Sequence, residues 1–132
     1  MRLDIKRISR ILFFIYIAAV GALCLIRTDS LPELPASWLG IPADKIAHFC
    51  MFIPFPVLSC MSIIGRRTGI WLSVAVIIVL AAMGSAFAYG TELLQGQTGY
   101  RSYDIADFYA DLAGLAAGAV ISVVYIIISR RK

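Results

Sequence analysis

Four apolar stretches alternate with short polar segments along this chain. They cover roughly residues 11–26, 46–64, 70–90 and 105–129. Each is close to the ~20 residues with which a helix crosses the hydrocarbon core of a bilayer. The pattern therefore predicts an all-α protein built as a bundle of four transmembrane helices, with one domain over residues 1–132 as the simplest organisation.

Proline positions predict where the bundle departs from straight helices. Pro54 and Pro56 lie in the middle of the second stretch, where they should kink the helix and free carbonyls that need partners inside the protein. The segment 27–43 carries three further prolines and Trp38, which is typical of a segment at the membrane interface. We expect this segment to cover part of one end of the bundle.

Composition agrees with a membrane protein. Hydrophobic residues make up 61% of the chain and charged residues only 15%, which is too apolar for a small soluble domain. The net charge of +4 comes from basic clusters that flank the apolar stretches, so we interpret them as topology signals and expect no nucleic-acid partner. Cys24, Cys50 and Cys60 lie in apolar stretches without paired spacing, which favours small buried side chains over disulfides or a metal knuckle.

The basic residues predict the direction of the helices. With a cytoplasmic N-terminus, nine of the twelve Lys and Arg residues lie on the cytoplasmic side: Arg2, Lys6, Arg7, Arg10, Arg66, Arg67, Arg130, Arg131 and Lys132. Because Lys and Arg resist translocation, we predict a multi-pass protein of the cytoplasmic (inner) membrane with both termini in the cytoplasm. No Ala-x-Ala motif follows the first span, so we interpret it as an uncleaved anchor.

The acidic residues show the opposite bias. In this topology, seven of the eight lie at the extracytoplasmic end: Asp29, Glu33, Asp44, Glu92, Asp104, Asp107 and Asp111. The topology rule does not require this, since Asp and Glu contribute little to orientation. The concentration of acids therefore predicts a polar cluster at the extracytoplasmic end of the bundle.

The second span begins with three of the candidate residues. Asp44 and His48 are four residues apart and share a helical face, with Lys45 beside them. Asp44 could instead serve as a helix cap or first-turn acid that complements the helix dipole. His48 should lie about one turn (~5 Å) inside the helix start, where a hydrogen bond between helices is the alternative to a functional role.

The third and fourth spans each carry polar residues above small ones on one face. In the third span, Ala81, Ser85, Ala88, Glu92 and Gln95 follow spacings of four, three, four and three. Small residues permit close helix packing in lipid, so this face should point into the bundle. In the fourth span, the corresponding residues are Asp104, Asp107, Asp111, Gly114 and Gly118.

Asp111 should lie deep in the membrane. It follows Asp104 by seven residues, which places it ~10 Å further along the helix axis. A carboxylate at that depth is costly toward lipid, so we expect it to point inward and to be paired, protonated or bound to a metal.

Together, three helix ends should bring five carboxylates close to two permanent cations and one histidine. The expected members are Asp44, Lys45, His48, Glu92, Gln95, Arg101, Asp104, Asp107 and Asp111. The excess of negative charge requires either protonation of one or two carboxylates or a divalent cation. The candidate metal ligands are His48, Glu92, Asp107 and Asp111.

This ordered set of residues resembles the VanZ-like family of bacterial membrane proteins. The motifs are Asp44-Lys45-x-x-His48-Phe49, Glu92-x-x-Gln95, Arg101-x-x-Asp104-x-x-Asp107, a polar residue at position 111 and Gly114-x-x-x-Gly118. The resemblance covers roughly residues 42–120. The family usually has Asn where this chain has Asp111. A cell-envelope role is what the resemblance implies, since the founding member is associated with low-level resistance to the glycopeptide teicoplanin.

We predict that the cluster binds or processes an envelope lipid or a lipid-linked cell-wall precursor at the outer leaflet. The residues expected to bind this substrate are Lys45, Gln95, Arg101 and Asp104. The residues expected to carry the chemistry are Asp44, His48, Glu92 and Asp107. Two alternatives stay open: a proton-coupled or small-solute transporter, which would need a homo-oligomer because four helices are few for alternating access, and a non-catalytic scaffold.

Overall fold

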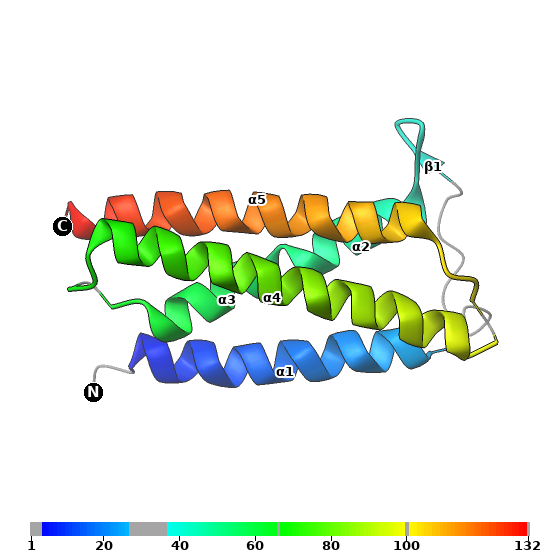
Figure 1. Cartoon of the computed structure of the whole chain (residues 1–132), viewed down its shortest axis with the longest axis horizontal. Helices are drawn as coiled ribbons and strands as arrows, with labels where there is room; N and C mark the ends of the chain where they lie inside the picture. Colours follow the sequence, from blue (N-terminus) through cyan, green and yellow to red (C-terminus); the bar gives the residue numbers. More distant parts are fainter. Residues whose placement is uncertain (1–3, 27–36, 66, 100, 132) are drawn as a thin grey trace.

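The computed structural model describes residues 4–26, 37–65, 67–99 and 101–131 as five helices and one small hairpin. Figure 1 shows the long helices lying side by side along one axis. The elements are α1 (Ile5–Leu25), β1 (Ser37–Trp38), β2 (Ile41–Pro42), α2 (Ala43–Phe52), α3 (Pro54–Ile63), α4 (Ile70–Gln97) and α5 (Ile105–Arg130).

Four helical spans are long and apolar enough to cross a membrane. They are Ile5–Leu25, Ala43–Ile63, Ile70–Gln97 and Ile105–Arg130, which confirms the predicted all-α bundle of four helices. The largest difference from the sequence prediction is in the third span, which continues seven residues beyond position 90. A criterion based on apolar runs stops at the first charged residue, whereas the helix continues because Glu92 and Gln95 are buried inside the bundle.

The second span is broken in the middle, as its prolines predict. Helix α2 ends at Phe52 and α3 begins at Pro54, which has no N–H to continue the hydrogen-bond ladder. Next to the break, the Tyr16 hydroxyl of α1 donates a hydrogen bond to the Met51 carbonyl at 2.9 Å. A side chain from another helix thus supplies a polar partner at the break.

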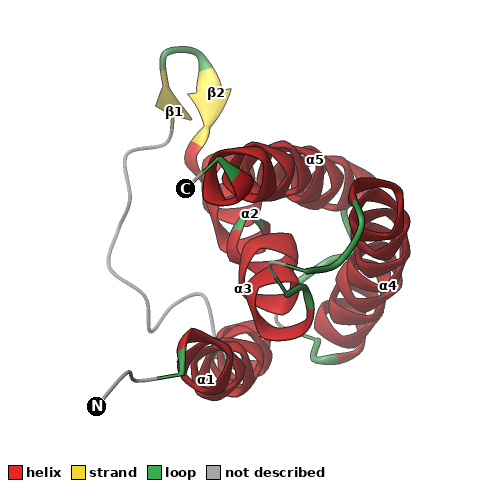
Figure 2. Cartoon of the chain, turned by 90° about the vertical axis from the view of Figure 1, so that its left-hand side faces the viewer, coloured by secondary structure: helices red, strands yellow, loops and turns green. Residues whose placement is uncertain are grey.

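The broken span is the centre of the bundle. Viewed along the helices, α3 lies between α1 on one side and α4 and α5 on the other (Figure 2). The backbone of α5 lies close to that of the second span: a Cβ on Gly114 would collide with the Phe49 carbonyl of α2, and one on Gly118 with the carbonyl of Ile53, between α2 and α3. The two glycines therefore let the backbones of α2 and α5 come into contact.

An aromatic core fills the bundle next to the polar end. Phe52 and Phe55 are buried with Ala88 and Leu115, and the Phe55 ring stacks on Phe87 with 5.9 Å between centroids. The outward faces carry exposed large apolar side chains such as those of Phe14, Trp71, Ile78, Tyr109 and Val120. An apolar exterior of this kind suits contact with lipid.

A two-stranded hairpin precedes α2. Ser37 pairs with Pro42 and Trp38 with Ile41, and the turn residues Leu39 and Gly40 both have positive φ. Figure 1 shows the hairpin projecting beyond the helices. Residues 27–36 lie outside the described residues, so the expected covering role of the segment 27–43 stays a prediction.

The start of α1 and the end of α5 lie at the same end of the bundle (Figure 1). The hairpin and the α4–α5 connection lie at the opposite end. The first turns of α2 and α5 and the last turns of α4 therefore meet at one end, where the polar residues gather.

Candidate functional site

The polar cluster is built from three helix ends. Helix α2 contributes its first turns, α4 its last turns, and α5 its cap and first turns. Phe52, one turn further along α2 than His48, is fully buried in the aromatic core. The cluster is thus closed on its inner side by apolar packing.

Lys45 joins α2 to α5 through three carboxylates. Its ammonium group donates to Asp44 at 2.9 Å, to Asp104 at 2.5 Å and also to Asp107. A lysine ammonium has three N–H donors, so these contacts use all of them. Lys45 therefore binds protein carboxylates, which leaves it without a donor for the head group that it was predicted to bind.

Asp104 caps α5. Its Oδ1 accepts a hydrogen bond from the Ala106 amide at 2.9 Å, which is the usual role of an N-cap side chain. The hydrogen bond from Lys45 lowers the pKa of the Asp104 carboxyl below its ordinary value. Asp44 does not cap α2, whose N-cap is Pro42. It lies in the first turn of α2, which confirms the alternative of a first-turn acid.

His48 lies between carboxylates on both sides of its ring and is only 3% exposed. Its Nδ1 is 2.9 Å from Asp111 Oδ1 and 3.7 Å from Glu92 Oε1. Its Nε2 is 3.6 Å from Asp107 Oδ2. The first contact is a hydrogen bond, and the other two are too long to be one.

Gln95 connects Glu92 to Arg101. With its amide oriented to satisfy both neighbours, its nitrogen donates to Glu92 Oε1 at 3.3 Å and its oxygen accepts from Arg101 Nη1 at 3.1 Å. Glu92 is 0% exposed, whereas Arg101 is partly exposed. Among the described residues, the guanidinium of Arg101 forms no ion pair and keeps donors for a ligand.

The nine predicted residues lie in one cluster, as three hydrogen-bonded groups that approach one another around His48 at 3.6 and 3.7 Å. Two buried oxygens in it, Glu92 Oε2 and Asp111 Oδ2, have no hydrogen-bond partner within the described parts of the chain. Both residues are 0% exposed. An unpartnered buried carboxylate oxygen is costly unless a proton or a cation accompanies it, so the network is incomplete as it stands.

Two sets of donor atoms are close enough to share a metal ion. One set comes from His48, Glu92 and Asp107, all buried, and the other from Asp44, Asp104 and Asp107. Within each set, the donor atoms lie within 4.8 Å of one another. The Lys45 ammonium already bonds all three carboxylates of the second set, so the first set is the candidate metal centre.

Three details differ from the sequence analysis. Asp44 is exposed and contacts Lys45, and no bond joins it to His48 in the described structure. Asp111 hydrogen-bonds to His48 Nδ1 and lies outside the three-residue donor set. The most buried line on α4 runs through Leu80, Gly84 and Ala88, while the predicted Ala81 and Ser85 are half-buried.

Two polar residues near the cluster, Tyr16 and Thr91, are not among those predicted from the sequence. Tyr16 bonds the backbone beside the α2–α3 break, and Thr91 is buried next to Glu92 with its hydroxyl bonded to the Ala88 carbonyl. In the sequence, Tyr16 could have been noticed as a lone tyrosine in an apolar stretch. Thr91 gives no such indication, because a helical threonine that bonds its own backbone is common.

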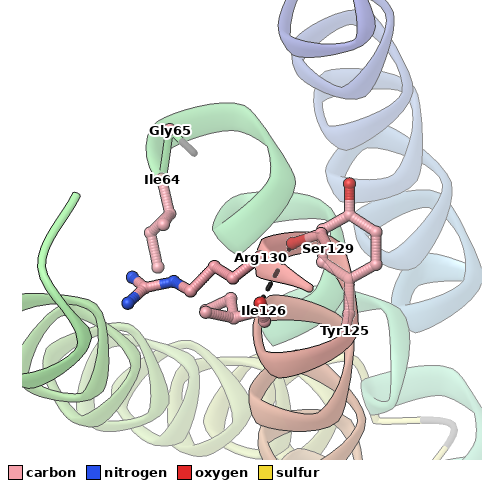
Figure 3. Close-up of a pocket in the computed structure, with 6 residues that line it drawn as sticks. All are labelled: Ile64, Gly65, Tyr125, Ile126, Ser129 and Arg130. Carbon is pink, nitrogen blue, oxygen red and sulfur yellow. Dashed lines mark hydrogen bonds between the residues drawn. The ribbon is translucent and has the colours of Figure 1, made fainter. Parts of the chain in front are cut away.

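A small pocket lies at the opposite end of the bundle (Figure 3). Ser129 donates to the Ile126 carbonyl at 3.1 Å, and Arg130 bonds the Thr68 carbonyl and the Ser73 hydroxyl. These contacts satisfy backbone groups near the helix ends. The pocket is lined by Ile64, Gly65, Tyr125, Ile126, Ser129 and Arg130. This lining includes no acid or histidine, so the polar cluster is the stronger candidate site.

Comparison of the chain with protein-family models, with curated proteins and with solved structures finds no match.

Proposed function

We propose that this protein is a VanZ-like membrane protein of the bacterial cell envelope that binds or processes an envelope lipid or lipid-linked precursor at its polar cluster. The observation that carries the proposal is the burial of Glu92 and Asp111, both 0% exposed, beside His48 at one end of four apolar helices. Ionisable groups at membrane depth are costly, so they mark functional sites by default.

Because acids outnumber bases in the cluster, an anionic head group needs a positive charge beside it, either one that it brings or one that the protein supplies. Arg101 is the permanent cation whose donors are not all used by protein groups in the described structure, and it lies at the rim of the cluster. A guanidinium suits recognition of a phosphate or carboxylate. The head group would thus lie between Arg101 and His48, with the acyl or isoprenoid chains outside the bundle among lipids.

His48 is the group best placed for chemistry. Its Nδ1 bonds Asp111, which fixes the ring, and its Nε2 faces Asp107 without a hydrogen bond. A ring held in this way can present Nε2 as a proton acceptor or as a metal ligand. Either role would act on a phosphoryl or acyl group bound beside it.

The orientation of the protein is part of the proposal. The described basic residues at the end formed by the start of α1 and the end of α5 are Lys6, Arg7, Arg10, Arg67, Arg130 and Arg131. A cytoplasmic location for that end follows the positive-inside rule. The polar cluster would then face the outer leaflet of the inner membrane, where lipid-linked cell-wall precursors are exposed.

The experiment measures binding of isoprenoid phosphate and pyrophosphate lipids to the purified chain by native mass spectrometry in chelator-containing buffer. We expect saturable binding that falls at least tenfold in Arg101→Gln, because the guanidinium supplies the free donors. Arg131→Gln, an exposed arginine at the opposite end, is the matched control and should bind as the wild type does. Equal binding by both variants would contradict the proposal.

A cellular test addresses processing. Alanine at His48, Glu92 or Asp107 should abolish the glycopeptide (teicoplanin) resistance conferred by the wild-type chain, with equal amounts of protein in the membrane. Retention of full resistance by all three variants would exclude a functional role for the cluster.

One observation also favours a proton-coupled transporter. Asp104, Asp107 and Asp111 descend one side of α5, and Asp111 Oδ2 has no partner among the described residues. Protons could occupy such a series in turn. Uptake into proteoliposomes that depends on a pH gradient would support this function over lipid binding.

If the protein were a non-catalytic scaffold, variants of the cluster would instead lose thermal stability in proportion to their loss of function.

A further inference from the structure

We propose that His48, Glu92 and Asp107 bind a divalent transition-metal ion through His48 Nε2, Glu92 Oε2 and Asp107 Oδ2. This inference concerns the same site as the proposed function and assigns it a cofactor. It rests on three donor atoms that are close together, oriented by other residues and without partners among the described residues.

Each of the three residues uses one polar atom for an outer contact and leaves the other free. His48 Nδ1 bonds Asp111, Asp107 Oδ1 bonds Lys45, and Glu92 Oε1 bonds the Gln95 amide. Metal ligands in proteins are typically held by such outer partners, which fix the ring or carboxylate in place. The outer contacts therefore orient a donor set and do not compete with it.

The ring nitrogens of His48 are too far from Glu92 and Asp107 to bond them, and one donor atom of each residue is close enough to the other two to share an ion. His48 Nε2 and Asp107 Oδ2 are 3.6 Å apart, beyond hydrogen-bond range. Two ligands about 2.1 Å from a tetrahedral ion lie roughly 3.4 Å apart. One donor from each of His48, Glu92 and Asp107 lies within 4.8 Å of the other two, so all three can move onto one ion with small shifts.

Glu92 supplies the independent evidence for a ligand. Its carboxylate is fully buried, belongs to the donor set, and has no partner for Oε2 in the described structure. Neither helix packing nor capping explains an acid in that position. A bound cation would satisfy the oxygen and offset the charge of the acids around it.

The donor types indicate the kind of ion. One imidazole nitrogen and two carboxylate oxygens suit Zn²⁺ or Mn²⁺, whereas Mg²⁺ and Ca²⁺ prefer oxygen ligands alone. Three protein ligands leave at least one coordination position open, as in catalytic metal sites. That position would accept water or an oxygen of an anionic head group that Arg101 also contacts.

The charge balance agrees with a dication. With neutral His48, the five carboxylates of the cluster exceed Lys45 and Arg101 by three negative charges. A dication reduces this excess to one without requiring protonated acids. The rival arrangement has an imidazolium at His48 with a proton on Glu92 or Asp111, and it predicts no metal binding.

The test titrates the purified full chain, in detergent and without added lipid, with Mn²⁺ followed by electron paramagnetic resonance, and then with Zn²⁺ as competitor. We expect about one ion per chain. Glu92→Gln and Asp107→Asn keep the side-chain size, remove a ligand charge and should weaken binding at least 100-fold. Asp111→Leu keeps a similar side-chain size but removes the outer contact to His48 Nδ1, and it should weaken binding roughly 10- to 100-fold.

Asp4→Asn is the matched control, because it makes the same chemical change at the cap of α1, at the opposite end, and asparagine still caps a helix. It should bind metal as the wild type does. No binding by the wild type at millimolar Mn²⁺ or Zn²⁺, or unchanged binding by both Glu92→Gln and Asp107→Asn, would overturn the metal site. Because metal is measured without lipid and lipid is measured with chelator, either proposal can fail while the other stands.

Discussion

The charged side chains at the two ends of the bundle differ in burial and in how they are connected. At the cluster end, carboxylates from α4 and α5 are buried around His48, and Lys45 joins three acids. At the other end, basic side chains make separate contacts with backbone carbonyls, as Lys6 does with Ile63 at 3.1 Å. Buried acids gathered around one histidine at one end thus contrast with half-buried or exposed basic side chains that share no partner at the other end.

We interpret the basic side chains as anchors of helix ends in the membrane and the buried acids as parts of a candidate site. A long basic side chain at a helix end can reach the interface with little loss of solvation. Glu92 and Asp111 cannot reach water in this way, since their side chains are inside the protein. Charges of the second kind are costly to maintain, which is why we assign function to that end.

The strongest test of the contrast removes one lysine from each end. Lys45→Met leaves Asp107 buried without its cation, so we expect a loss of about 3–5 kcal/mol in the free energy of unfolding. Lys6→Met removes an exposed contact and should cost less than about 0.5 kcal/mol. Unfolding by denaturing detergent in mixed micelles measures both. Similar values for the two variants would show that the cluster is no more coupled than the basic end.

The second test asks whether close backbone packing holds the cluster together. A methyl group on Gly114 collides with the Phe49 carbonyl, so Gly114→Ala should separate α2 from α5 and cost about 1–3 kcal/mol or more. Gly21→Ala is the control, because a Cβ there meets nothing within 4 Å. Thermal unfolding followed by circular dichroism compares them. A Gly114→Ala protein as stable as Gly21→Ala would show that this packing is dispensable.

Much of this architecture could be predicted from sequence, because membrane burial restricts what each pattern can mean. Apolar length gives the four spans, and proline without an N–H gives the break before Pro54. Helical spacing gives the inward face of Asp107 and Asp111. These predictions depend on local chemistry and period alone.

Which side chains contact one another in the cluster could not be predicted, since this depends on how the helices are rotated against one another. Spacing places Asp44 and His48 on one face, yet only His48 enters the bundle, because Asp44 lies at the exposed start of α2. Lys45 can be recognised as a cation of the cluster, whereas its three acidic partners emerge only when α5 is packed beside α2. The role of Tyr16 depends likewise on α1 lying beside the break.

A third, smaller effect tests whether contacts at the basic end are independent. Arg130→Met removes the donor to the Thr68 carbonyl and to Ser73 Oγ, the latter at 2.9 Å, and should cost about 1 kcal/mol. Arg131→Met, one residue later and exposed, should cost less than about 0.5 kcal/mol. Combined with Lys45→Met, Arg130→Met should be additive, because the two residues share no partner. Strong coupling between them in the unfolding free energy would contradict the separation of the two ends.

The smallest effect is a local titration at the rim of the cluster. The hydrogen bond from Lys45 holds the pKa of Asp104 below its ordinary value, so the stabilisation it brings is present above the unfolded pKa, about 3.9, and is lost as the pH falls through the folded pKa. Carboxyl ¹³C resonances followed by NMR in micelles should give an Asp104 pKa below about 3.9 in the wild type. The value should rise in Lys45→Met and stay unchanged in Lys6→Met, whose lysine lies at the other end. A wild-type pKa at or above the ordinary value would mean that Lys45 does not stabilise the charged form of Asp104 and contacts only Asp107 and Asp44.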